Sequence, residues 1–130
     1  SRGRRRPMPS APLVGSCHCG AVRLQIARRP RQLTTCNCSI CRRYGAQWAY
    51  YTWKSVRVEG REALLAYRGR QRRREFMHCR ACGCVVFHEH AKKTGPTTRI
   101  AVNARMFAPQ DLAGVRVRRL DGAQSWKYLD

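Results

Sequence analysis

The chain has 130 residues, with 27 lysines and arginines against seven aspartates and glutamates, which gives a formal net charge of +20. This length fits one domain with a modest core, and no run of about 18 apolar residues is present that could span a bilayer. These features exclude a membrane-spanning protein, and because the sequence shows no export signal we expect a cytoplasmic one.

The first segment, residues 1–12 (SRGRRRPMPSAP), is basic, rich in proline and poor in apolar side chains. Such a composition cannot bury enough surface to fold, so we expect a disordered basic arm before a zinc-binding domain at 13–130. The positive charge attracts nucleic acids and small anions alike. We therefore expect that the arm can bind nucleic acid non-specifically. The net charge alone does not indicate an oligomeric state.

The pattern of the remaining chain is mostly that of β-strands. Residues 21–26 alternate apolar and polar side chains, as a half-buried strand does, and residues 56–59 alternate likewise. A short polar break containing Gly60 precedes residues 63–67 and indicates a hairpin. Further strands are expected at 47–53, 75–78, 85–88, 99–102 and 115–120, and helical turns at 40–43 and 109–112.

Eight cysteines in so short a chain indicate either disulfides or metal ligands. Pairs such as Cys17 and Cys19 are only one residue apart, so a bond between them would close almost no loop. Close clusters instead allow two sulfurs to reach one ion from a tight turn. The spacing therefore favours metal over disulfides.

The cysteines form three clusters, which together predict two different metal sites. The outer clusters each supply two ligands, and these would close a structural site of four thiolates: Cys17, Cys19, Cys79 and Cys82. The middle cluster supplies Cys36, Cys38 and Cys41, and three protein ligands with an exchangeable fourth position are typical of catalytic zinc.

One alternative makes both sites structural. The eighth cysteine, Cys84, or one histidine would then complete the second tetrahedron and leave no room for a substrate. The candidate histidines are His18, His78, His88 and His90.

These motifs resemble the family of glutathione-dependent formaldehyde-activating enzymes (GFA) and centromere protein V. The resemblance extends from about Leu13 to Trp126. It is carried by residues 15–23 (GSCHCGAVR), 36–43 (CNCSICRR) and 79–83 (CRACG), with Asn103, Asp121, Gly122 and Trp126.

The resemblance implies a β-tent fold of antiparallel sheets, held together by zinc knuckles. It implies two zinc ions, one structural on Cys17, Cys19, Cys79 and Cys82 and one catalytic on Cys36, Cys38 and Cys41. It also implies carbon–sulfur lyase activity, the reversible addition of a thiol such as glutathione to formaldehyde or another small aldehyde.

Arginines and aromatic residues near the middle cluster are candidates for substrate binding. Arg42 and Arg43 follow Cys41, and arginine binds carboxylates such as those of glutathione with two parallel hydrogen bonds. Solvated surface charges are the alternative for both. On the next predicted strand only one face can line a pocket, either Trp48 with Tyr50 or Tyr51 with Trp53.

Two other functions fit the same residues. A nucleic-acid or chromatin-type binding module would keep zinc only for stability and bind through the basic arm and residues 68–74 (RGRQRRR). A redox or metal sensor would release the ion when its thiolates are oxidised.

Overall fold

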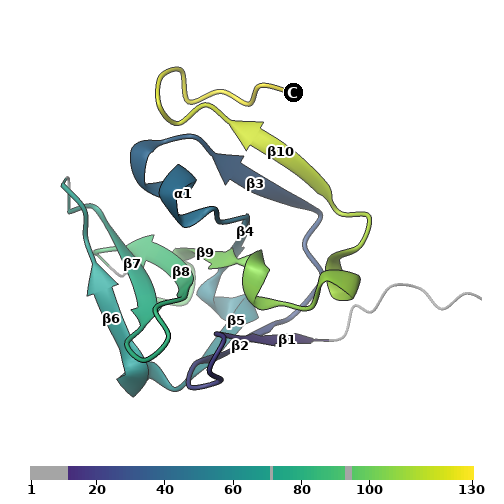
Figure 1. Cartoon of the computed structure of the whole chain (residues 1–130). Helices are drawn as coiled ribbons and strands as arrows, with labels where there is room; N and C mark the ends of the chain where they lie inside the picture. The colour runs from purple at the N-terminus through teal and green to yellow at the C-terminus, as the bar shows by residue number, and fades with distance from the viewer. Residues whose placement is uncertain (1–11, 71, 93–94) are drawn as a thin grey trace, which may run out of the picture.

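The computed structural model describes residues 12–70, 72–92 and 95–130, whose strands form two sheets (Figure 1). The prediction of a mostly β protein is confirmed. The predicted disordered arm lies, except for Pro12, outside the described residues, and the first element begins at Leu13. None of the described helices has the length and apolar character needed to cross a membrane.

The smaller sheet is antiparallel and contains three strands in the order β1-β2-β5. Alternate residues, among them Leu24 and Ile26, are buried against the larger sheet, while Arg23 is exposed. The strands are β1 (Leu13–Ser16), β2 (Arg23–Ile26) and β5 (Val56–Glu59).

The larger sheet has seven strands in the order β10-β3-β4-β9-β8-β7-β6. Its described pairs are antiparallel except β10 with β3, which run parallel, so the expectation of antiparallel sheets needs correction at this edge. Parallel neighbours need a long connection, and most of the chain separates these two. The strands are β3 (Gln32–Cys36), β4 (Trp48–Thr52), β6 (Leu64–Tyr67), β7 (Arg74–Cys79), β8 (Val85–His90), β9 (Arg99–Asn103) and β10 (Arg116–Leu120).

The hairpin predicted around Gly60 is wrong. β5 pairs with β2, whereas β6 pairs with β7, so the two strands belong to different sheets. Gly60 has a φ of 85°, which favours glycine, and a Cβ there would overlap the carbonyl oxygen of Ala21. The chain turns at this glycine and crosses from one sheet to the other through the 3-10 helix η2 (Arg61–Ala63).

Short helices connect the strands. The helix α1 (Ser39–Tyr44) follows β3, and Gly45 ends it in the left-handed conformation. Both helical turns predicted from the sequence are present, the second as η4 (Pro109–Leu112) with proline in its first turn. The other 3-10 helices are η1 (Trp53–Ser55) and η3 (Ala104–Met106).

The buried apolar residues form two clusters, and the smaller one holds α1 in place. The larger cluster fills the space between the sheets and includes Leu24, Phe87 and Val102. The smaller one packs Cys41 of α1 against Trp48 and Phe76 of the larger sheet. In Figure 1, α1 and β3 accordingly lie above β4 and β9.

Candidate metal centres

Two loops separated by 60 residues of chain form a group of four cysteines. The Sγ atoms of Cys17, Cys19, Cys79 and Cys82 all lie within 4.8 Å of one another. Cys17 and Cys19 follow β1, while Cys79 ends β7 and Cys82 precedes β8. A metal ion here would join the smaller sheet to the larger one.

Both loops are turned so that backbone N–H groups approach the sulfurs. The N–H of Val22 donates to Sγ of Cys17 at 3.3 Å, and that of Ala81 donates to Sγ of Cys79 at 3.4 Å. Backbone N–H groups of Cys84 and Cys19 lower the pKa of Cys82 to about 5. Because metals bind the thiolate and not the thiol, this environment suits metal ligands.

A second group forms where β3 ends and α1 begins. Cys36 is the last residue of β3, Cys38 caps the N-terminus of α1 and Cys41 lies in its first turn. Their Sγ atoms also lie within 4.8 Å of one another. A hydrogen bond from Cys41 lowers the pKa of Cys36 to about 5 and correspondingly raises the pKa of Cys41. The sulfurs are thus close enough to share one positive ion.

The donors around this second group also fit a metal-bound thiolate. The indole Nε1 of Trp48 is buried and has no hydrogen-bond partner of ordinary geometry in the described chain. It nevertheless lies close to Sγ of Cys41 and favours the ionised form of that thiol. A thiolate held by zinc at Cys41 would supply the missing acceptor.

The C-terminal segment covers one side of the second group. The backbone N–H of Gly122 approaches Sγ of Cys36 and helps to lower the pKa of that thiol. Asn37, between two of the cysteines, donates to Oδ1 of Asp121 at 3.0 Å and accepts from the N–H of Ala123 at 2.9 Å. Sequence reasoning matched Asp121 and Gly122 to a family pattern but did not place them, since more than 80 residues separate them from Asn37.

Gly122→Ala is expected to weaken metal binding at the second group. A Cβ at residue 122 would overlap Sγ of Cys36 and approach Cβ of Cys38 at 3.4 Å, so Cys36 must move. Disturbing groups that support metal ligands typically costs about 10- to 100-fold in metal affinity. Competition with a chelator would measure the zinc affinity, which should fall for only one of the two bound ions. Ala123→Ser, at the exposed next residue, is the control, and equal affinities in both variants would contradict the prediction.

The remaining candidate ligands lie outside both groups. Within residues 12–70, 72–92 and 95–130, neither Cys84 nor any of the four histidines joins them. Cys84 lies beside the first group, where the N–H of His18 and the thiol of Cys82 interact with it. The geometry gives no support to the alternative in which Cys84 completes the second site.

The aromatic residues of β4, together with Trp53 at the start of η1, divide between two faces. Tyr51 and Trp53 point into the core between the sheets, where the Tyr51 hydroxyl donates to the Arg28 carbonyl at 2.9 Å. Trp48 and Tyr50 share the other face, and Cys36 and Cys41 both raise the pKa of Tyr50, though less than burial does. Of the two predicted pairs, Trp48 with Tyr50 lies on the side of the second group.

Arg42 and Arg43 are exposed in the last turn of α1. The guanidinium of Arg43 donates to the carbonyl of Ser39 at 2.7 Å and lines a surface hollow of about 480 Å³ together with Tyr44, Cys84 and Arg105. Their role in carboxylate binding stays a prediction.

A family model described as glutathione-dependent formaldehyde-activating enzyme matches residues 12–115. The chain belongs to the GFA family. The matched segment contains the seven cysteines of both groups, whereas β10 and the loop around Gly122 lie beyond it.

A solved structure is similar to this GFA chain over most of its length. The crystal structure of a Rhodobacter sphaeroides protein, a structural genomics target, is 31% identical and has a TM-score of 0.64. The match covers 81% of this chain and 99% of that one. The two chains therefore share the same fold.

Proposed function

We propose that the protein is a zinc-dependent carbon–sulfur lyase that reversibly adds a thiol to a small aldehyde, with glutathione and formaldehyde as the first pair to test. The observation that carries this proposal is the group of three cysteines, to which no fourth protein ligand is added in the described chain. Three ligands leave one position of a zinc tetrahedron for a substrate. A reducing cytoplasm, where glutathione and free thiolates coexist, suits such a protein.

Zinc, when bound by Cys36, Cys38 and Cys41, would lower the pKa of a thiol substrate from its free value of about 8.5. The sulfur of that substrate would then be a thiolate near neutral pH. The chain's own residues keep the three ligands ready for this task. The N–H of Gly122 approaches Cys36, and the indole of Trp48 faces Cys41. These donors fix the directions of two sulfurs and reduce their negative charge.

The positive surface supports an anionic thiol as substrate. Arg42 and Arg43 extend from the helix that carries Cys41, and Arg105 lines the same hollow as Arg43. Glutathione carries two carboxylates, which guanidinium groups bind in pairs. We therefore place the acidic ends of the thiol along this side of α1.

Exchange NMR of formaldehyde with glutathione tests the proposal directly. The zinc-loaded protein should increase the exchange rate between free formaldehyde and the S-hydroxymethyl adduct well above the spontaneous rate. A neutral thiol such as 2-mercaptoethanol is the matched comparison, and we expect a smaller effect because it offers no carboxylates. The lyase proposal would be wrong if the exchange rate equalled the spontaneous rate with every thiol and aldehyde tried.

A further inference from the structure

One row of residues crosses the face of the larger sheet that lies under the second cysteine group. Tyr50 on β4 is opposite Ala101 on β9, Ala101 is opposite His88 on β8, and His88 is opposite Phe76 on β7. Directly paired residues point to the same side of a sheet. Tyr50 and His88 therefore stand on this face with only the small side chain of Ala101 between them in the row.

His88 is a largely buried polar residue whose ring lies between two aromatic side chains. It is 9% exposed, and its ring packs edge-on against Trp48 at 4.5 Å and lies 5.0 Å from Phe76. It forms no hydrogen bond with any residue that the structure describes. Its ring nitrogens are not among the fully buried polar atoms that lack a partner, so solvent still reaches them, and a substrate that enters beside Trp48, which itself contacts Cys41, could take the place of that water.

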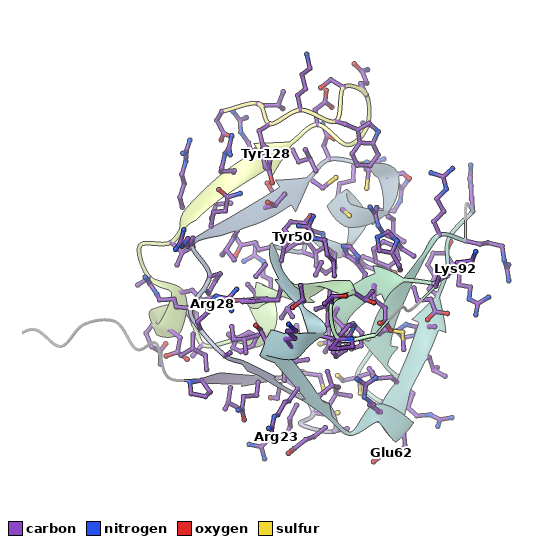
Figure 2. All side chains as sticks on the ribbon, turned by 180° about the vertical axis from the view of Figure 1, so that it is seen from behind. Arg23, Arg28, Tyr50, Glu62, Lys92 and Tyr128 are labelled. Carbon is purple, nitrogen blue, oxygen red and sulfur yellow. The ribbon has the colours of Figure 1, made fainter. Side chains whose placement is uncertain are left out.

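Tyr50 presents a second polar group to the same region. Its side chain is 37% exposed, and its hydroxyl likewise has no hydrogen-bond partner in the described chain. Figure 2 shows Tyr50 in the middle of the molecule and Tyr128, which belongs to the C-terminal segment, above it. The ring is fixed from one side by Arg99, whose guanidinium lies 5.3 Å from the ring centre.

Both groups are neutral hydrogen-bond donors at physiological pH. Burial raises the pKa of Tyr50 to about 12, so its hydroxyl keeps its proton. Burial, assisted by the charges of Arg74 and His90, lowers the pKa of His88 to about 3, so its imidazole is uncharged. A neutral imidazole always carries one N–H, and neutral donors can polarise a carbonyl, as in other enzymes.

We infer that Tyr50 and His88 bind the aldehyde oxygen while the thiol adds to the carbonyl carbon. This inference rests on the proposed lyase function. In the addition the sulfur–carbon bond forms, the carbon–oxygen π bond breaks and negative charge develops on the oxygen. The oxygen finally receives the proton that the thiol lost, so the sum is one thiol and one aldehyde giving one S-hydroxyalkyl product.

The chemistry of the cysteine group explains why such donors are needed. Three thiolates already donate charge to the ion, which weakens its ability to stabilise a second anionic atom. Donors fixed in advance in a partly buried site stabilise developing charge more effectively than water does. Tyr50 and His88 would supply this stabilisation from the sheet, opposite the sulfur of the thiol.

Phenylalanine substitutions test this inference because they keep the rings and remove the donors. His88→Phe and Tyr50→Phe should each lower kcat for glutathione and formaldehyde by about 100-fold, the usual effect of losing one such donor. The dissociation constant for glutathione alone and the zinc content should not change. His88→Gln retains an N–H donor and should recover part of the lost rate.

An NMR measurement provides a readout independent of turnover. In protein labelled with ¹⁵N-histidine, the His88 signals are those missing from the His88→Phe variant. Adding glutathione together with formaldehyde should shift these ring signals toward hydrogen-bonded values, whereas glutathione alone should not.

The outcomes separate this inference from the lyase proposal. An inactive wild-type protein would remove the proposed function and this inference with it. An active wild type with full kcat in both phenylalanine variants would overturn the inference alone. Loss of zinc or of glutathione affinity without a change in kcat would show a merely structural role and would also overturn it.

Discussion

Cys79→Ala is expected to unfold the whole domain. Cys79 is fully buried at the end of β7, and its sulfur belongs to the group of four that joins the two sheets. A structural zinc site contributes on the order of 10–16 kcal/mol. The net stability of a domain is only about 5–15 kcal/mol, so loss of this site removes most or all of it. Circular dichroism and the dispersion of amide NMR signals should both show an unfolded chain.

Cys84→Ala is the matched control for this change. Cys84 is a partly buried cysteine only two residues from Cys82, yet its sulfur lies outside both groups. We expect this variant to bind zinc normally and to keep a native spectrum. A Cys79→Ala protein with native NMR dispersion and an unchanged melting temperature would contradict the assignment of the first group as the structural centre.

The positions of the metal ligands were the most predictable part of the molecule. Cysteine pairs such as Cys17 with Cys19 converge because one residue separates them, so their geometry is nearly local. Only the association of the first pair with Cys79 and Cys82 required long-range information, and the preference of zinc for four ligands supplied it. Both groups accordingly contain the cysteines expected from spacing.

Pairing between strands was less predictable, because alternation shows that a strand exists but not which strand lies next to it. Strands at 56–59 and 63–67 were both expected, yet the chain turns at Gly60 and the two strands join different sheets. β1 and β3 were missed, since each is short and runs directly into a cysteine cluster that dominates its local pattern.

The surroundings of the second group could not be derived from spacing. Gly122 approaches Cys36 only because β10 lies beside β3, a contact between distant parts of the chain. The sequence offered His88 only as one of four candidate histidine ligands, and its apolar neighbours Val86 and Phe87 gave no sign of another role. Its position across Ala101 from Tyr50 depends on the register of three strands.

Cys38→Ala is expected to abolish lyase activity while the fold survives. Cys38 is partly buried at the start of α1, and its sulfur contributes only to the group of three. Two remaining ligands bind zinc weakly, so one of two zinc ions should be lost and the exchange rate should fall to the spontaneous value. Zinc analysis, circular dichroism and exchange NMR on one sample would measure all three properties.

The domain should tolerate this loss because α1 has other anchors. Ile40 and Tyr44 of the helix pack against the cluster that contains Trp48 and Phe76, and none of these contacts depends on a metal. Ser39→Ala, at the exposed neighbouring position, is the control and should retain both ions and full activity. If Cys38→Ala unfolds the chain as completely as Cys79→Ala does, the second group is structural as well. If it stays folded and fully active with one ion missing, the chemistry takes place elsewhere.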